Sequence, residues 1–455
     1  MFAQSRPRKN MDLLPLVLPK PLLQQQGPCE KRPDDFMDDF ELPSHFRKPL
    51  HEIYPETIHE DMQFLEEEHL YISDINGIKI PASDSVTKFA HDYQEHFNGR
   101  LAISMMKNAT KKKWPRLEYV VNSKRVEKCD LTSESGCMMV CSDSTVSVIQ
   151  PNSTFGLDSD TIYNLLNEMK LETESSEEEL YVFERTMTDD EILYKWERNG
   201  LLKRNMGTAA HRNCELALEG LPYRWYDPEM KAFFTFIKDY MVPKGATIMS
   251  TEREIRSLKL DIAGSVDAVF KMPDDSIIVV DWKLSDKLYM NMTGFRKMMA
   301  PLNHLDDCDG AGYALQTSIY QYLFEEEYGY TVSERILVSL SPDHPFITSV
   351  PYLKNEVKYI MEKQEKLVQA RNSLTNFKCE ITGKTLVKPV RCEDGRIVSE
   401  KVALLHKLQY TPDNEMEQQL DDEINKILVP VIFNKEGTQN WKKMMPKHGG
   451  IKPFS

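Results

Sequence analysis

The sequence lacks a run of apolar residues long enough to cross a membrane, which takes about 20 residues, and it lacks a secretory signal pattern. Its eight cysteines are scattered along the chain. Cys129, Cys137 and Cys141 lack the paired C-x-x-C spacing of a zinc site. These absences predict an intracellular protein of a reducing compartment with no membrane partner. They do not distinguish the nucleus, the mitochondrion or a viral compartment.

Positive charge is also scarce, because 57 Lys and Arg face 71 Asp and Glu, a net charge of −14. Binding along DNA rests on neutralising phosphates, so this balance excludes a protein that coats duplex DNA with its whole surface. A local basic channel is still allowed. Much of the acidity lies in residues 30–68 and 172–179, which we expect to be solvated.

One short segment, residues 107–116, does combine basic residues with an aromatic one. Such a segment would follow a single strand through charge and base stacking; the alternative is a solvated basic loop. The candidate nucleic-acid contacts are Lys111, Lys112, Lys113 and Trp114.

A phosphate-binding loop is missing as well. Residues 383–385 read Gly-Lys-Thr, but the loop needs a glycine where the chain has Lys378. The sequence therefore indicates no helicase or ATPase module.

At 455 residues the chain is long enough for one main domain with appendages. We expect a disordered acidic region at 1–75, a helical lead-in at 76–200 with a low-complexity insertion at about 118–180, a main domain at 201–372 and a small C-terminal appendage at 373–455. Helices are expected at 189–198 and 208–219. The order of helix, three strands, helix and strand in the main domain predicts an α/β fold with a mixed central sheet flanked by helices.

Two neighbouring predicted strands carry acidic residues toward one place. Gly264–Asp267 belongs to the first, Ile277–Lys283 is the second, and residues 272–275 form the turn between them. Side chains alternate along a strand, so Asp281 and Lys283 share one face. Charged groups at the end of an apolar strand are costly to bury. A divalent metal would account for the carboxylates, and the alternative is a buried Asp–Lys ion pair.

Helical spacing groups further polar residues on both sides of these strands. His211 precedes Glu215 by one turn, and Gln316 precedes Tyr320 by one turn inside the predicted helix 313–328. Residues four apart project from the same side of a helix. Each pair would therefore present two side chains to one site.

Four motifs occur in order between residues 207 and 320: G-T-x-x-H at 207–211, G-x-x-D at 264–267, D-x-K at 281–283 and Q-x-x-x-Y at 316–320. In this combination the chain resembles the PD-(D/E)XK nuclease superfamily, in its RecB-like branch. It is similar to mitochondrial genome maintenance exonucleases and virus-encoded members. The resemblance implies a restriction-endonuclease-like core and metal-dependent hydrolysis of DNA. It also implies exonuclease action on single strands or ends, in DNA repair, recombination or genome processing.

The resemblance also implies roles for individual residues. Asp267, Asp281 and the backbone carbonyl of Trp282 would bind Mg²⁺ or Mn²⁺, with His211 as an additional ligand. Lys283 would orient the attacking water or neutralise phosphate oxygens, and its pKa would be lowered beside a metal.

The remaining implied roles concern placement. Gln316 and Tyr320 would line the active site and meet the nucleic acid. Glu215 would orient His211 or else form a surface salt bridge. Of the two glutamates on the preceding strand, Glu254 is preferred to Glu252 as an extra carboxylate near the site.

Two further features concern the region after the Q-x-x-x-Y motif. The CRISPR-adaptation nucleases hold an iron–sulfur cluster through cysteines that follow the Q-x-x-x-Y helix, and only Cys379 and Cys392 follow it here, so no iron–sulfur cluster is expected. Residues 377–395 faintly resemble the start of a U-box. The alternatives to a nuclease are therefore a non-catalytic nucleic-acid-binding scaffold, or an interaction protein with a U-box-like C-terminal segment.

Overall fold

The computed structural model describes residues 62–66, 68–109, 114–127, 138–142, 145–149, 181–224, 227–286, 288–434, 438, 441–445 and 452–453. Residues 1–61, most of the predicted acidic region, lie outside this part of the chain. Among the helices of these residues, none is both long and apolar enough to cross a membrane.

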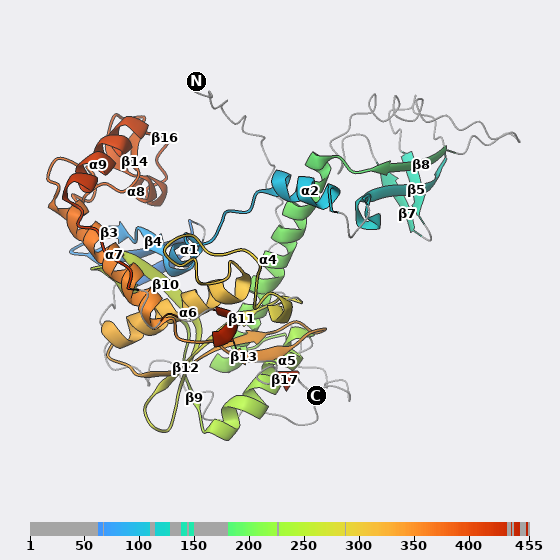
Figure 1. The fold of residues 1–455 in the computed structure, drawn as a ribbon, viewed down its shortest axis with the longest axis horizontal. Helices are drawn as coiled ribbons and strands as arrows, with labels where there is room; N and C mark the ends of the chain where they lie inside the picture. The colour runs from blue at the N-terminus through green and yellow to red at the C-terminus, as the bar shows by residue number, and fades with distance from the viewer. Residues whose placement is uncertain are drawn as a thin grey trace, which may run out of the picture. The chain divides into compact units, whose positions relative to one another are not determined.

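A mixed seven-stranded sheet forms the centre of the main domain (Figure 1). Its strands follow the order β17 (Lys452–Pro453), β13 (Phe346–Ser349), β12 (Val332–Ser339), β11 (Ile277–Lys283), β10 (Ile262–Lys271) and β4 (Asp84–Ser85), and β9 (Thr247–Ser257) also pairs with β10. β11 and β12 are parallel, whereas β10 is antiparallel to both β9 and β11. The predicted α/β class with a mixed sheet is confirmed.

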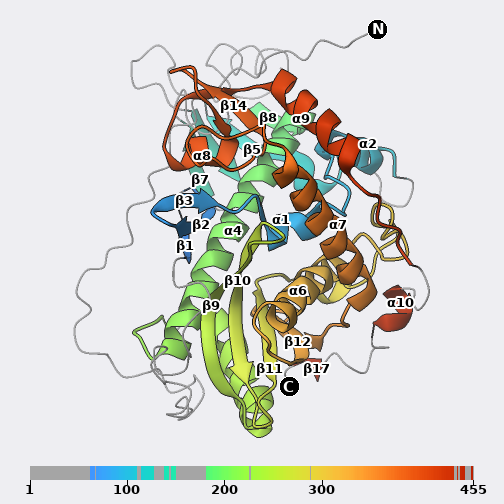
Figure 2. The same ribbon diagram turned by 90° about the vertical axis from the view of Figure 1, so that its left-hand side faces the viewer.

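Helices pack on the two faces of this sheet. On one face lie α1 (Val86–His91), α6 (Asp309–Glu326) and α7 (Lys354–Ser373). Leu315 and Ile319 of α6 belong to the same main hydrophobic core as Val279 of β11. On the other face α5 (Glu229–Phe236) places Phe233 5.6 Å from the ring of Trp282. The alternation predicted for β11 is therefore observed. Figure 2 shows α6 and α7 next to each other beside the strands.

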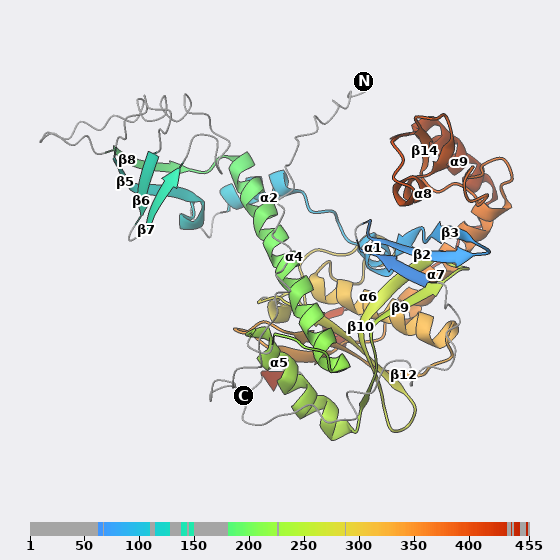
Figure 3. The same ribbon diagram turned by 180° about the vertical axis from the view of Figure 1, so that it is seen from behind.

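The long helix α4 (Asp189–Glu219) replaces the two helices predicted at 189–198 and 208–219. It begins with a capping box formed by Thr188 and Glu191, and it ends at Gly220 in the left-handed conformation (φ 72°). Gly200 and Gly207 lie inside it. A glycine weakens a helix by about 1 kcal/mol relative to alanine, which is not enough to break it. Figure 3 shows α4 running from β9 and β10 to α2 (Gly99–Lys107), which it contacts at its beginning.

Two small sheets occupy segments where little order was predicted. β1 (Met62–Leu65), β2 (Leu70–Ile75) and β3 (Ile78–Pro81) form an antiparallel sheet, so the disordered region predicted to end at residue 75 is wrong for these residues. Leu70 and Ile72, both on one side of β2, are buried and stabilise it. Within the predicted insertion, β5 (Val120–Glu127), β6 (Met138–Ser142) and β7 (Thr145–Ile149) form a second antiparallel sheet with β8 (Tyr181–Thr186). Its strand order is β7-β6-β5-β8.

The C-terminal appendage has its own hydrophobic core. Strands β14 (Pro389–Cys392), β15 (Ile397–Ser399) and β16 (Tyr410–Pro412) pack with helices α8 (Glu400–Leu405) and α9 (Asn414–Ile427). The chain then returns to the main domain, where Phe433 packs against the main core. In α10 (Trp441–Met444), Trp441 is fully buried and its indole N–H donates to the carbonyl of Met292 (2.7 Å). The appendage thus ends before Phe433 and not at residue 455.

Candidate metal centre

Three acidic residues lie in a row across β9, β10 and β11. Val266 pairs with Arg253 and Ala268 with Thr251, which places Asp267 opposite Glu252. Ala268 also pairs with Val280, and continuing that register places Asp267 opposite Asp281. Opposite residues of neighbouring strands share a face and lie about 5 Å apart, where like charges destabilise the sheet. Three ionised carboxylates in this row would repel one another, so a positive charge nearby is needed to stabilise them.

Asp267, at the middle of the row, has two nitrogen partners. The backbone N–H of Trp282 donates to its Oδ2 (2.7 Å), and Nδ1 of His211 from α4 lies 3.5 Å from the same oxygen. Burial would raise the pKa of Asp267, but His211 and Lys283 lower it below its ordinary value. Burial would likewise lower the pKa of His211, and Asp267 raises it. Asp267 is thus favoured as an anion and His211 as its partner.

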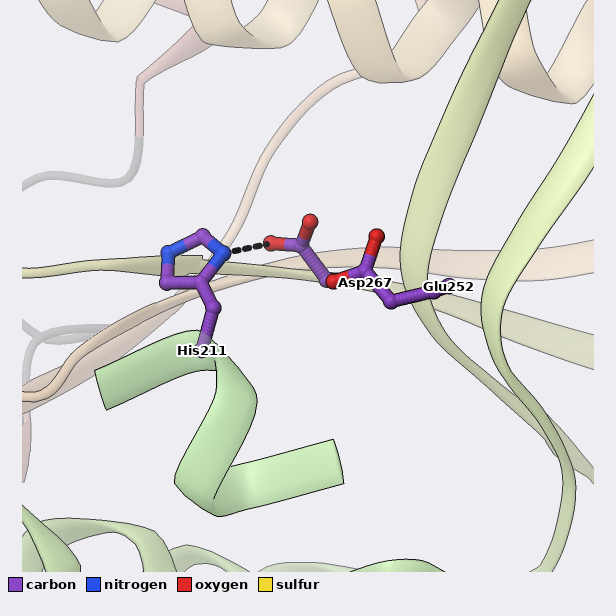
Figure 4. Close-up of side chains that lie close together, drawn as sticks. All are labelled: His211, Glu252 and Asp267. Atoms are coloured by element: carbon purple, nitrogen blue, oxygen red, sulfur yellow. Dashed lines mark ion pairs between the residues drawn. The ribbon is translucent and has the colours of Figure 1, made fainter. Parts of the chain in front are cut away.

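Glu252 completes a close group with these two residues. Figure 4 shows His211, Glu252 and Asp267 pointing toward one another, and one donor atom of each lies within 4.8 Å of the others. Ser265 Oγ donates to Glu252 Oε2 (2.8 Å), and burial and Asp267 raise the pKa of Glu252 to about 7. A nitrogen and two carboxylate oxygens at this spacing are suitable ligands for a divalent cation.

The backbone at Glu252 helps to explain this placement. Its φ is +41°, a conformation that residues other than glycine rarely adopt. Such strain costs on the order of 1–3 kcal/mol and is found where the surrounding structure, and often function, maintains it. Glu254, which the sequence favoured, accepts a hydrogen bond from the backbone N–H of Phe64 in β1 (3.0 Å) and is not in the close group. Glu252 therefore replaces Glu254 as the extra carboxylate.

Asp281 and Lys283 form an ion pair next to this group. Lys283 Nζ lies 2.8 Å from Asp281 Oδ2 and 4.4 Å from the ring centre of Tyr313 in α6. Asp281 is 3% exposed. Burial and the neighbouring Asp267 raise its pKa to about 6 despite the ammonium of Lys283. One ammonium thus does not fully compensate the charge of this carboxylate.

The pKa of Lys283 differs from the sequence expectation. Burial would lower it, but Asp281 and Asp267 together raise it above the ordinary lysine value. The expectation of a lowered pKa assumed that a cation already balances the two carboxylates. With both carboxylates acting on it directly, Lys283 is held in its charged form.

Gln316 and Tyr320 contact each other as their spacing predicts. Gln316 Nε2 donates to Tyr320 Oη (3.3 Å) and to Thr87 Oγ1 of α1 (3.2 Å). Tyr320 is 2% exposed, and burial raises its pKa. A Cβ at Gly264 would lie 2.9 Å from Tyr320 Cε1, so the glycine of the G-x-x-D motif allows α6 to approach β10. The two side chains thus connect α6 with α1 beside the carboxylate row.

The other predicted residues have different surroundings. Glu215 forms an ion pair with Arg212 (2.5 Å), which supports the salt-bridge alternative over a role in orienting His211. Trp114 is partly buried, stacks on Tyr119 (5.7 Å) and packs against a small cluster that includes Ile103 and Met106. Its role as a base-stacking platform stays a prediction. Lys111, Lys112 and Lys113 lie outside the described residues.

Sequence reasoning missed one residue of the site entirely. Tyr71 of β2 has a raised pKa, caused by burial and then by Glu252 and Glu254. It lies in the segment predicted to be disordered. The available signal was the apolar alternation of Leu70 and Ile72 on either side of Tyr71. This alternation predicts a strand, and Tyr71 then lies on its other face, where it can approach a neighbouring element.

Comparisons with known proteins add little to this geometry. No family model and no curated protein matches the chain. Thirteen chains of solved structures do match. One of them, described as "Crystal structure of SSO0001", is 22% identical over 35% of this chain and 66% of that chain, which is just under two thirds, with a TM-score of 0.18. A likeness at this TM-score carries no argument about fold or function.

Proposed function

We propose that this chain is a divalent-metal-dependent nuclease that hydrolyses phosphodiester bonds of DNA. The observation that carries the proposal is the close group of His211, Glu252 and Asp267, with the Asp281–Lys283 pair beside it. Carboxylates, joined in this group by an imidazole, are the common ligands of Mg²⁺ and Mn²⁺ in hydrolases, and the three side chains are half-buried.

The charges of the group suit a cation. Three carboxylates of the row face Lys283 and His211, and the pKa values of Glu252 and Asp281 are raised to about 7 and about 6 by burial and by Asp267. Raised values mean that the ionised forms are under-compensated. His211, Glu252 and Asp267 would hold a divalent ion, and Asp281 would contribute its charge. Such an ion, when bound, polarises a phosphoryl oxygen and lowers the pKa of water.

The protein's own groups supply the rest of the chemistry. Lys283 is charged and lies between Asp281 and the Tyr313 ring. In this proposal it would donate to a phosphate oxygen on which negative charge develops. Tyr320, whose pKa is raised by burial, remains protonated, and its hydroxyl oxygen accepts a hydrogen bond from Gln316, so its O–H would be left to donate to the substrate. Gln316 holds Tyr320 and Thr87 together and so fixes the distance between α6 and α1.

The choice of DNA, the exonuclease mode and a role in repair, recombination or genome processing rest on the motif resemblance. The rival hypotheses are a scaffold that binds nucleic acid without cutting it and an interaction protein with a U-box-like segment. One experiment separates the first rival from a nuclease, because a scaffold binds without releasing product.

The experiment incubates the protein with end-labelled single- and double-stranded DNA, linear and circular, and with matched RNA, in Mg²⁺, Mn²⁺ or excess chelator. We expect cleavage of linear DNA that needs the metal, while circular DNA stays intact. Asp267→Asn is the inactive control. Binding without cleavage of any polymer would favour the scaffold, and neither binding nor cleavage would rule out the proposed function.

A further inference from the structure

A cavity of about 530 Å³ lies where the end of α1, the segment 291–296 and the start of α6 meet. Most of its lining side chains are polar and carry hydrogen-bonding groups. Those used below are His91, Gln94, Phe97, Asp307 and Asp309. The volume lies within the range of about 300–1,000 Å³ that is usual for small-molecule sites.

The cavity adjoins the candidate metal centre through two helices. On α1, Thr87 accepts the hydrogen bond from Gln316, and His91 lines the cavity one turn later. On α6, Asp309 lines the cavity, and Tyr313, one turn later, lies below Lys283 Nζ (4.4 Å). Partial burial and the charge of Lys283 lower the pKa of His91. Residues four apart share a helix face, so both helices lead from the centre to the cavity.

Polar side chains that line the cavity are fixed by hydrogen bonds. Gln94 Nε2 donates to Asp307 Oδ1 and to the carbonyl of Cys308, each at 3.2 Å. A Cβ at Gly312 would lie 2.8 Å from Gln94 Oε1, so the glycine leaves room for this amide. Asp307 Oδ2 is buried and accepts no hydrogen bond from the described residues, although Arg296 Nη2 lies 3.4 Å away. This oxygen is compensated by the charge of Arg296 but can still accept a hydrogen bond, because an ionised carboxylate oxygen has more than one acceptor site. It therefore suits a ligand that brings an N–H group.

An exposed aromatic ring lies at the rim. Phe97 is 70% exposed, and its ring centre lies 5.9 Å from that of Trp196, tilted by 55°. A flat apolar surface next to amide and carboxylate groups matches a nucleobase, which has an apolar face and polar edges. A base inside a duplex is covered on both faces by its neighbours, whereas an unpaired base offers a free face to such a ring.

We propose that this cavity binds one unpaired nucleotide of the strand whose phosphodiester lies at the candidate metal centre, with its base on Phe97. The inference rests on the proposed nuclease function and narrows its substrate to strands that are single near the cut. Base stacking on one aromatic ring changes affinity by about 5- to 100-fold.

The test measures binding of a fluorescent single-stranded oligonucleotide by anisotropy, with the full-length protein in Ca²⁺ to suppress cutting. Phe97→Leu should weaken binding about tenfold, whereas Phe97→Trp, which keeps an aromatic ring, should bind as the wild type does. Leucine still fills the contact with Trp196, so the pair of variants separates stacking from packing. Ile432→Ala, at another exposed apolar position (89% exposed), is the matched control and should change nothing.

Blunt duplex of the same sequence should bind all four proteins equally. Equal single-strand affinity of Phe97→Leu and wild type would overturn the inference while leaving the nuclease proposal intact, provided that the wild type cuts DNA. A wild-type protein that neither binds nor cuts DNA would overturn both.

Discussion

Glu252 shows at the residue scale why the candidate centre needs a cation. Its pKa is raised to about 7 from an ordinary value of 4.5, chiefly by burial and by Asp267. Between these values the folded protein keeps a proton that the unfolded chain has released. The free energy of unfolding therefore falls as pH rises through this window, by at most about 3.5 kcal/mol, since one pKa unit corresponds to about 1.4 kcal/mol.

This reasoning predicts the pH dependence of stability in excess chelator. The melting temperature of the wild type should fall between pH 5 and pH 8, and Glu252→Gln should flatten that fall because its amide does not ionise. Glu326→Gln, an exposed carboxylate at the end of α6, is the control and should retain the wild-type slope. A slope that Glu252→Gln leaves unchanged would show that Glu252 is not the titrating group.

Lys283 provides a second residue-scale prediction, since its role depends on what balances Asp281. In chelator, Lys283→Ala leaves a buried carboxylate unpaired and should lower the free energy of unfolding by roughly 3–5 kcal/mol. In Mg²⁺ the loss should be small, while hydrolysis slows by about two to three orders of magnitude, as for other lost electrostatic catalysts. Thermal melts in both buffers and single-turnover rates check this. A variant that is equally destabilised in both buffers and cuts at the wild-type rate would make Lys283 a structural ion-pair partner.

At the scale of elements, sequence patterns between neighbouring residues predicted the structure well, whereas contacts between residues far apart in the chain were not predicted. The alternation in β11 placed Asp281 and Lys283 on one face and Trp282 on the other, because successive side chains of a strand point to opposite faces whatever the rest of the fold. The choice between Glu252 and Glu254 depended on the register of β9 and on a positive φ at Glu252. Neither has a local signal, so the sequence favoured the wrong glutamate.

The same contrast explains Trp114 and Tyr71. The lysines next to Trp114 predicted a contact with nucleic acid, but not its packing against α2 and Tyr119. The pKa of Tyr71 is raised by the charges of Glu252 and Glu254, which lie about 180 residues further along the chain. Contacts of this kind depend on tertiary packing, which composition and spacing do not determine.

Helix α4 gives a prediction at this scale. Gly207 lies inside α4, and a Cβ there would meet nothing within 4 Å. Gly207→Ala should therefore stabilise the protein by about 1 kcal/mol without changing metal affinity. Gly220→Ala in the same helix, at φ 72°, should destabilise it by a similar amount. Chemical denaturation of the two variants checks the signs, and lost hydrolysis with Gly207→Ala would indicate that substrate approaches the backbone there.

At the scale of the whole molecule, the candidate centre gathers residues from distant parts of the chain. α4 supplies His211, three neighbouring strands supply the carboxylate row, and α6 and α1 close the opposite side through Gln316 and Thr87. The net charge of −14 makes a local excess of carboxylates harder to keep ionised, because the surrounding field is negative. A bound divalent cation is the simplest way to hold such a group together at neutral pH.

Calorimetric titration of Mn²⁺ into the wild type and into Asp267→Asn tests this claim most directly. Asp267 has donor atoms close to His211 and Glu252 and lies opposite Asp281 in the row. We predict that the wild type binds Mn²⁺ at neutral pH and that Asp267→Asn binds it at least about tenfold more weakly, while both remain folded. A wild type that gives no binding heat, or a folded Asp267→Asn protein with unchanged Mn²⁺ affinity, would contradict a metal centre at this place.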